Sequence, residues 1–234
     1  MDGLFVTFEG TEGSGKSTQI QILADRLLGL KREVVILREP GGTSIGEQVR
    51  TILKDPKRGA AMFPETELLL MNASRAQLVR EVIRPALTVG KVVLCDRFFD
   101  STIAYQVYGR ELDSNHAQRI IDFAVGDTRP HLTLLLRVPL EVSELRRRQR
   151  ATERGEQQDR LEAENRAFFE RVEQGYDAIA ASTSTRIRCI DGTLPPDQVH
   201  AEIWRWVEAL LCSPPTLGER AWKTIGEYRT EGPA

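Results

Sequence analysis

The sequence predicts one α/β domain of three layers, in which a parallel sheet of five strands lies between two layers of helices. Five short apolar runs are spread along the chain, as expected for strands that are buried on both faces of a sheet. Segments with helical spacing of apolar residues separate consecutive runs, and this alternation is typical of parallel strands. The chain has 234 residues, of which 41% are hydrophobic and 28% charged, so it can bury the core of one such domain.

The strands are expected where the apolar runs fall. These runs lie at residues 4–8, 34–37, 91–95, 131–136 and 186–190. Pro40, Gly41 and Gly42 follow the second run closely, and they predict a sharp turn with exposed backbone N–H groups. Ligands of such folds bind beyond the carboxyl ends of the strands, so we expect the functional residues at that edge of the sheet.

Apolar residues spaced three and four positions apart predict the helices. They cover approximately residues 16–30, 45–53, 64–85, 115–125, 139–150, 159–176 and 196–211. Pro64 suits the first turn of its helix, whereas Pro85 should end or kink it. Residues 98–109 are expected to form a loop and a short helix. Residues 151–158 are polar, contain Gly155 and lack apolar periodicity, so we expect a mobile loop there.

Charge and cysteine content argue against several classes of protein. The formal net charge of −2 disfavours a dedicated nucleic-acid-binding protein. Cys95, Cys189 and Cys212 are far apart and form no C-x-x-C pair, so we expect buried thiols in a reducing, cytoplasmic compartment. The sequence opens with an apolar strand and lacks a run of about 18 apolar residues, so neither a signal peptide nor a membrane span is predicted.

Residues 10–17 read Gly-Thr-Glu-Gly-Ser-Gly-Lys-Ser, which matches the phosphate-binding pattern G-x-x-x-x-G-K-S between a strand and a helix. Its glycines let the backbone curl, so that several N–H groups point at one anion. The positive end of the following helix adds to the attraction. Lys16 supplies a cation for the outer phosphates and is a candidate catalytic residue.

A possible metal site lies beside this loop. Asp96 ends the third apolar run, and proteins with such a loop hold Mg²⁺ at a carboxylate in this position. The hydroxyl of Ser17 is the second candidate ligand. Arg97 follows Asp96 directly, so a further cation is expected at the same strand end.

The remaining motifs favour a small-molecule kinase among proteins with such a loop. The chain has no N-K-x-D string, which disfavours a guanine-specific GTPase, and it is short for a motor ATPase. Small kinases need two nucleotide-sized sites and a mobile lid that carries arginines. The stretch from Arg146 to Arg160 provides such arginines around Gly155.

Five short segments, in the same order along the chain, form the pattern of one enzyme family. They are Glu9–Gly13, Arg38–Thr43, Ala73–Gln77, Asp96–Phe98 and Ala104–Gln106. Together they resemble bacterial thymidylate kinases, and the second segment, Arg-Glu-Pro-Gly-Gly-Thr, is specific to that family. The resemblance implies a P-loop kinase domain over residues 1–211, with a lid near residues 146–160. It leaves residues 212–234 as a C-terminal extension that is a candidate for disorder.

The resemblance implies that phosphate is transferred from ATP to dTMP, which gives dTDP for dTTP synthesis. It also implies Mg²⁺ as cofactor, a homodimer that associates through helices, and neither a nucleic-acid nor a membrane partner. Mg²⁺ would bind Ser17 and Asp96. ATP would bind Gly10, Thr11, Glu12, Gly13, Ser14, Gly15, Lys16, Ser17 and Thr18. The acceptor phosphate has a second pKa of about 6, so it needs no general base at neutral pH.

The resemblance further implies an acceptor site. Its dTMP contacts would be Glu12, Arg38, Arg50, Met71, Arg75, Arg97, Thr102, Tyr105 and Gln106. Glu12 would bond the 3′-hydroxyl, and all these arginines except Arg75 would hold the phosphate. Arg75 would bond the thymine edge, with Thr102 and Gln106 near the base. Tyr105 would pack beneath C2′ and leave no room for a ribose hydroxyl.

Two residues depart from the family pattern. Met71 stands where the family usually has Phe or Tyr stacked on thymine, although a thioether also packs on rings. Arg137 stands where the fourth strand commonly ends in Asp.

The phosphate loop has no basic residue among its four variable positions, so a cation for the transition state must come from elsewhere. Arg154 and Arg160 match the R-G-E and D-R-L patterns of the family's lid. With Lys16 and Arg97 they are the candidate catalytic residues.

Two alternatives remain open at the level of sequence. One is a kinase for another nucleoside monophosphate. The other is a nucleotide-dependent protein that contacts nucleic acid through the run Arg146–Arg150.

Overall fold

The computed structural model describes residues 3–55, 61–154 and 159–212. Part of the connector expected before Pro64, part of the loop expected at 151–158, and nearly all of the C-terminal extension therefore lie outside the described residues.

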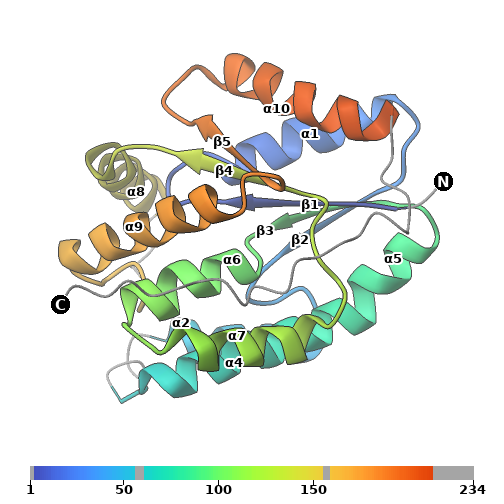
Figure 1. Ribbon diagram of the computed structural model, residues 1–234. Coiled ribbons are helices and arrows are strands. Elements are labelled where there is room, and N and C mark those ends of the chain that lie inside the picture. Colours follow the sequence, from blue (N-terminus) through green and yellow to red (C-terminus); the bar gives the residue numbers. More distant parts are fainter. Residues whose placement is uncertain (1–2, 56–60, 155–158, 213–234) are drawn as a thin grey trace.

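Five parallel strands form the central sheet, in the order β2-β3-β1-β4-β5 (Figure 1). They are β1 (Leu4–Glu9), β2 (Val34–Arg38), β3 (Val92–Asp96), β4 (Leu132–Arg137) and β5 (Ile187–Asp191). Every neighbouring pair is parallel, which confirms the predicted fold class. Because all strands run the same way, their carboxyl ends share one edge, and β1 delivers the phosphate loop to its centre.

Two helices cover one face of the sheet, α1 (Lys16–Gly29) and α10 (Pro196–Cys212) (Figure 1). Leu4, Val6 and Phe8 of β1 point into this layer, where they pack with apolar residues of both helices. Phe5 belongs to the cluster on the other face. Side chains alternate across a strand, so the second face carries Phe5, Thr7 and Glu9, and both faces of β1 are buried.

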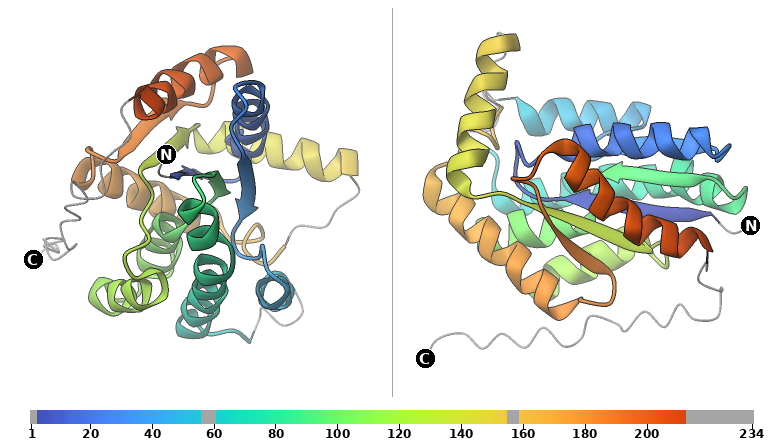
Figure 2. Two further views of the ribbon diagram at one scale, coloured as in Figure 1. Left: turned by 90° about the vertical axis from the view of Figure 1, so that its right-hand side faces the viewer. Right: turned by 90° about the horizontal axis from the view of Figure 1, so that it is seen from above.

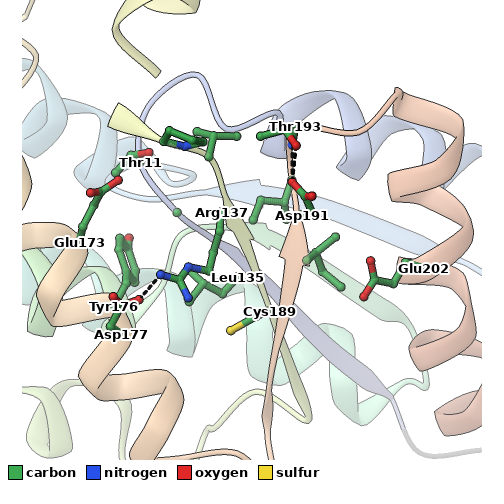
Figure 3. A pocket seen from close by; sticks show the side chains of 15 residues that line it. Thr11, Leu135, Arg137, Glu173, Tyr176, Asp177, Cys189, Asp191, Thr193 and Glu202 are labelled. Atoms are coloured by element: carbon green, nitrogen blue, oxygen red, sulfur yellow. Dashed lines mark hydrogen bonds and ion pairs between the residues drawn. The ribbon is translucent and has the colours of Figure 1, made fainter. Parts of the chain in front are cut away.

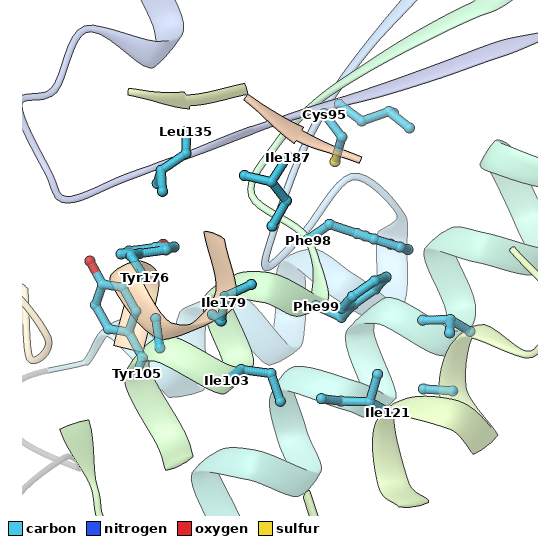
Figure 4. Close-up of a cluster of buried hydrophobic side chains, with 14 of the residues drawn as sticks. Cys95, Phe98, Phe99, Ile103, Tyr105, Ile121, Leu135, Tyr176, Ile179 and Ile187 are labelled. Atoms are coloured by element: carbon cyan, nitrogen blue, oxygen red, sulfur yellow. The ribbon is translucent and has the colours of Figure 1, made fainter. Parts of the chain in front are cut away.

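Most of the remaining helices lie on the opposite side of the sheet from α1 and α10 and build the core of the second layer, whereas α8 projects from the carboxyl edge of the sheet (Figures 1 and 2). The remaining helices are α2 (Ser44–Lys54), α4 (Pro64–Leu78), η1 (Val79–Ile83), α5 (Arg84–Thr88), α6 (Phe99–Thr102), η2 (Ile103–Gly109), α7 (Ser114–Val125), α8 (Leu140–Arg154) and α9 (Arg166–Ser182). Figure 4 shows their shared core, in which Tyr105 and Tyr176 stand at the end nearest the strand carboxyl termini.

The helix that begins at Pro64 does not end at Pro85. It passes through a π-helical segment, η1, in which the N–H of Arg84 bonds the carbonyl of Val79, and it continues to Thr88. Pro85 has no N–H to donate, and the wider turn before it accommodates this loss. The expected disturbance therefore lies just before the proline.

Residues 98–109 are helical throughout most of their length, so the expectation of a loop there was wrong. α6 continues directly into the π-helix η2, which packs closely on α9. Packing on α9 buries Ile103, Ala104 and Tyr105, and this burial stabilises a conformation that local sequence does not favour.

The lid region also differs from expectation. α8 extends to Arg154, so residues 151–154 are helix instead of loop. The next helix, α9, begins at Arg166, where Asn165 caps it by accepting from the N–H of Phe168 at 2.9 Å. Residues 159–165 are therefore a connector and not the first turns of that helix.

All three cysteines are free, and only Cys95 is buried, so the expectation of buried thiols was wrong for Cys189 and Cys212. In the described part of the chain, no helix combines the length and apolar character that a membrane crossing requires.

Candidate active site

The phosphate loop joins β1 to α1 in a backbone path that requires glycine. Gly10, Gly13 and Gly15 have φ values of 130°, 78° and 99°. A Cβ atom on Gly10 would lie 2.3 Å from the carbonyl oxygen of Leu136, so no other residue fits there. The loop ends at the amino terminus of α1, where free N–H groups and the helix dipole attract an anion.

Lys16 folds back over this loop. Its Nζ donates to the carbonyl oxygens of Gly10 at 3.1 Å and Thr11 at 2.9 Å, and only 5% of the residue is exposed. Burial, and then the charge of Arg97, lower the pKa of Lys16. Both effects disfavour an unpaired ammonium, so bringing phosphate oxygens here would be electrostatically favourable.

The two predicted metal ligands meet beside Lys16. The Ser17 hydroxyl donates to Oδ2 of Asp96 at 3.1 Å, which joins the start of α1 to the end of β3. Hydroxyl and carboxylate oxygens are the donors that Mg²⁺ prefers, and Mg²⁺ commonly takes only one or two protein ligands plus phosphates. Within residues 3–55, 61–154 and 159–212, no cluster of three or more His, Cys, Asp or Glu residues forms a closed metal site.

Arg97 connects the phosphate loop to the predicted acceptor side. Its Nη2 donates to Oε1 of Glu12 at 2.9 Å and to the hydroxyl of Tyr105 at 3.1 Å. The guanidinium also lies over the Tyr105 ring, 4.9 Å from its centroid. Arg97 has φ of 70°, which is unusual for a residue with a side chain. The structure thus brings together three predicted dTMP contacts, Glu12, Arg97 and Tyr105.

Glu9 lies behind Arg97 and is not among the predicted site residues. This carboxylate is 1% exposed and accepts hydrogen bonds from Phe98, Ser101 and Tyr176. Burial, and then the charge of Asp100, raise its pKa to about 7. A glutamate at the end of a strand gave no local signal for this, because its partners come from distant segments.

Arg75 is the most buried of the predicted acceptor arginines. Its Nε and Nη2 reach Oε2 of Glu39 at 2.8 and 2.7 Å, and Nη1 donates to Asn72 and Thr102 at 2.9 Å each. Only 2% of Arg75 is exposed, and its guanidinium faces the ring of Phe98. The expected contacts Arg75 and Thr102 therefore bond each other.

Gln106 and Met71 complete the side of the site formed by α4 and η2. Gln106 is buried and donates from Nε2 to Oε1 of Glu67 at 2.8 Å. Met71 is partly buried on α4, one residue before Asn72, which bonds Arg75. The predicted base contacts thus share two neighbouring elements.

Arg38 and Arg50 lie around the turn that follows β2. Nη2 of Arg38 pairs with Glu47 at 2.8 Å, and half of its side chain is exposed. Nη1 of Arg50 donates to the carbonyl oxygen of Pro40 at 2.8 Å. Burial, and then the charge of Arg38, lower the pKa of Arg50. Two cations held this close favour an anionic ligand between them.

Of the two candidate catalytic arginines of the lid, Arg160 does not contact the phosphate loop in the described part of the structure. Arg160 is ion-paired with Glu67, and its Nε donates to the carbonyl oxygen of Leu53 at 3.0 Å. Burial disfavours the charge of Glu67, but Arg110 and Arg160 outweigh this effect, and its pKa is lowered. Arg154 ends α8, and its side chain lies outside what the structure describes.

Two residues of α8 that were not among the predicted catalytic or substrate-binding residues contact the phosphate loop directly. The Ser143 hydroxyl donates to the carbonyl oxygen of Glu12 at 2.6 Å, and Nη1 of Arg146 donates to that of Gly13 at 3.2 Å. Arg146 also bonds the carbonyl oxygen of Gly192 at 3.0 Å, which ties the loop to the turn after β5. The amino-terminal part of the lid helix is therefore fixed to the loop.

A cavity of about 740 Å³ opens next to the loop, at the ends of β4 and β5 (Figure 3). Thr11 and Tyr176 line it, and Arg137 crosses it to pair with Oδ1 of Asp177 at 2.5 Å. This ion pair gives Arg137, the departure noted at the end of the fourth strand, a structural partner on α9. Burial, and then the charge of Asp177, raise the pKa of Glu173 at the same wall.

Comparison with known proteins decides the family. A family model described as thymidylate kinase matches residues 8–203 of this chain. The chain belongs to the thymidylate kinase family. The matched range runs from β1 into α10 and includes every site residue named above.

Individual thymidylate kinases agree with this assignment along nearly the whole chain. The thymidylate kinase of Kosmotoga olearia is 46% identical over 209 residues, which are 89% of this chain and 96% of that protein. The thymidylate kinase of Syntrophotalea carbinolica is 49% identical over 201 residues, 86% of this chain and 93% of that protein. The crystal structure of the thymidylate kinase from Ehrlichia chaffeensis superposes with a TM-score of 0.71 at 32% identity. It covers 88% of this chain and 100% of that one.

Proposed function

We propose that this thymidylate kinase phosphorylates dTMP to dTDP with ATP as the donor, and that Mg²⁺ assists the transfer. Family membership supports the reaction. The observation that carries the assignment of the two sites is the bond between Glu12 of the phosphate loop and Arg97. It joins an element suited to donor phosphates to a cation suited to the acceptor phosphate.

The donor site is assigned to the phosphate loop, from Gly10 to Thr18. Its N–H groups and Lys16 would bind the phosphates of ATP, and Mg²⁺ would be held by Ser17 and Asp96. When bound, Mg²⁺ neutralises charge on the outer phosphates. Lys16 keeps its ammonium at the loop by bonding two carbonyl oxygens, so it needs little reorganisation when ATP binds.

The acceptor site is assigned to the side of the sheet where Arg97 stands. The dTMP phosphate would compete with Glu12 for Nη2 of Arg97, and Glu12 would instead bond the 3′-hydroxyl. Arg38 and Arg50 would approach the phosphate from the turn after β2. Tyr105, whose ring lies beneath the guanidinium, would limit the space at C2′.

The base would lie toward α4. Met71 would pack on thymine through its thioether. Arg75 and Thr102 would share their hydrogen bonds with the base edge, and Gln106 would border it. Since Arg75 is already bonded to Glu39, it would act mainly as a fixed donor whose orientation does not change on binding.

The transfer itself requires alignment and charge neutralisation. The acceptor is already a dianion at neutral pH, because its second pKa is about 6. Lys16 and Arg97 would hold the two substrates in line, while Arg154 and Arg160 would supply lid cations in the transition state. Arg160 would first have to leave its ion pair with Glu67.

The organisation of the chain is proposed as follows. Residues 1–211 form the kinase domain, with the lid near residues 146–160 and an extension from residue 212. Two copies associate through helices. The exposed apolar side chains Ile45, Leu69 and Phe123, on the neighbouring helices α2, α4 and α7, support such a contact. Sedimentation equilibrium of the wild type and of Phe123→Glu tests the dimer.

The reaction is tested by coupled ADP release with each of dTMP, dUMP, UMP, CMP, GMP and AMP. Turnover should be fastest with dTMP and should need Mg²⁺. Preference for another monophosphate would overturn the acceptor assignment. Absence of turnover with all six, together with salt-dependent binding to DNA, would favour the nucleic-acid-binding alternative.

A further inference from the structure

Glu9 is a buried carboxylate at the last position of β1, directly before the phosphate loop, and the proposed reaction leaves it without a role. Its Oε1 accepts from the backbone N–H of Phe98 at 2.7 Å and of Ser101 at 3.3 Å. Phe98 is the residue before α6, and its own side chain caps no N–H group. Glu9, the last residue of β1, therefore caps the amino terminus of α6.

This cap fixes the turn that carries Arg97. Arg97 lies in the left-handed region, with φ of 70°, and its N–H bonds the carbonyl oxygen of Phe8 at 2.9 Å. A side chain in this region is held only when its surroundings determine the backbone on both sides. Phe8 holds Arg97 from the preceding strand, and Glu9 holds the next N–H group, that of Phe98.

The second oxygen of Glu9 orders two hydroxyl groups. Oε2 accepts from Oγ of Ser101 at 2.6 Å and from the hydroxyl of Tyr176 at 2.9 Å. Nη1 of Arg97 donates to these same two oxygen atoms, at 3.0 and 3.1 Å. Each hydroxyl has one hydrogen. When both hydrogens point at the carboxylate, both oxygens turn lone pairs toward Arg97.

The geometry points to Glu9 as a positioning residue for phosphoryl transfer, whose carboxylate aims Arg97 by fixing its turn and by orienting the hydroxyls of Ser101 and Tyr176. The inference rests on the proposed contact between Arg97 and the acceptor phosphate. Glu9 touches no substrate in this assignment and acts only through these groups.

Glu9→Gln tests the inference with almost no change in size. The amide nitrogen can donate but not accept, so at least one hydroxyl must turn its hydrogen toward Arg97 and lose that bond. We expect kcat/KM for dTMP, measured at about pH 8 or above, where Glu9 with its pKa of about 7 is ionised, to fall about 10- to 100-fold. This is the range for loss of a charged hydrogen bond. KM for ATP should stay unchanged, because Arg97 is assigned to the phosphate of dTMP.

Asp100→Asn is the matched control. Asp100 is also a buried carboxylate on this turn, but it pairs with Arg186 at 2.7 and 2.8 Å. Its loss should lower the melting temperature without lowering kcat/KM for dTMP, because removing the negative charge of Asp100 favours the ionised carboxylate of Glu9. A purely structural role for Glu9 would produce this same pattern in Glu9→Gln and would overturn the inference.

A double-mutant cycle with Arg97→Ala separates this inference from the proposed function. In the Arg97→Ala background, Glu9→Gln should have little further effect on kcat/KM for dTMP. Additive losses would overturn the inference alone. A normal kcat/KM in Arg97→Ala itself would overturn both, because Arg97 would then not serve the acceptor.

Tyr176→Phe keeps the test decisive if Glu9→Gln does not fold. It removes one hydroxyl and preserves the ring, so a smaller loss in the same direction, again confined to dTMP, is expected. Unchanged kinetics with dTMP in this variant would contradict the inference.

Discussion

The two halves of the proposed site hold their positive charge in different ways. On the donor side, Lys16 rests on two backbone carbonyl oxygens and has no hydrogen-bonded carboxylate partner among those the structure describes. On the acceptor side, the described arginine pairs join separate elements: Arg97 with Glu12, and Arg75 with Glu39. The ammonium of Lys16 can therefore pair with a ligand without giving up a carboxylate. A ligand that binds Arg97 must replace its ion pair with Glu12.

This difference has an energetic consequence. A buried ammonium without a carboxylate is destabilised in the free protein, and an anionic ligand removes the penalty. A buried ion pair already satisfies its cation, so a ligand gains only the difference between two partners. The donor side should therefore respond more strongly to loss of its cation than the acceptor side does.

Lys16→Ala should produce the largest effect. We expect kcat to fall about 1000-fold, in the range for loss of one well-placed charge at a transition state. The melting temperature should not fall, because Lys16 bonds carbonyl groups and its removal leaves no buried carboxylate unpaired. Steady-state ADP release and thermal melts measure the two quantities. Lys91→Ala, at a largely exposed ion pair with Glu33, is the matched control.

A large loss of stability in Lys16→Ala would contradict this view of the donor side. It would mean that Lys16 holds the loop together, and that its kinetic effect cannot be assigned to the ligand.

Mutation of the lid arginines tests whether cations outside the phosphate loop also supply charge to the donor phosphates. Arg154→Ala or Arg160→Ala should lower kcat at least about 100-fold with little change in KM for dTMP, since such a contact strengthens in the transition state. Arg160→Ala should additionally lower stability, because Glu67 loses one of its two described cation partners. Near-normal kcat in both variants would direct attention to Arg147 and Arg148.

The strand, loop and helix around Lys16 could be predicted because their signals are local. The strand, the glycines and Lys16 are within a few positions of each other, and the largely apolar run at residues 4–8 predicts a strand buried on both faces. The five strands were predicted for the same reason, since strand burial shows directly in the apolar runs.

The acceptor side could not be derived in this way. Glu9 and Tyr176 are 167 positions apart in the sequence, and Arg160 bonds Leu53, which is 107 positions away. Neither bond leaves a periodic signal, so the roles of Glu9 and Arg160 in the fold became visible only in three dimensions. The π-helix η2 was missed because packing on α9 determines it, and local propensity does not.

The contribution of Glu9 to the free energy of unfolding should depend on pH. Its pKa is raised from 4.5 to about 7, mainly by burial and by Asp100. A raised carboxyl pKa favours the protonated folded state, so this contribution to stability is complete below pH 4.5 and disappears as pH rises through 7. The free energy of unfolding of the wild type relative to Glu9→Gln should fall by about 1–3 kcal/mol over this range.

Urea titrations at several pH values measure this difference. A difference that rises with pH would show that bonds to the ionised carboxylate outweigh its burial. Asp100→Asn should weaken the dependence without abolishing it, because burial, the larger cause of the raised pKa of Glu9, remains after the charge of Asp100 is removed.

Tyr105 should show the smallest effect, because it discriminates between acceptors and contributes little charge. Its ring lies beneath the guanidinium of Arg97, and its hydroxyl accepts from Nη2 at 3.1 Å. Tyr105→Ala opens the space assigned to C2′, so activity on UMP relative to dUMP, which differ only at the 2′ position, should rise about 10-fold, as for one steric contact. Tyr105→Phe keeps the ring and loses the hydroxyl, so it should lower activity on UMP and dUMP equally.

An unchanged ratio in Tyr105→Ala would make this tyrosine a packing residue of the core shared with Phe168 and Tyr176. Exclusion of ribonucleotides would then have to come from a residue other than Tyr105, because Glu12 is assigned to the 3′-hydroxyl, which ribo- and deoxyribonucleotides share.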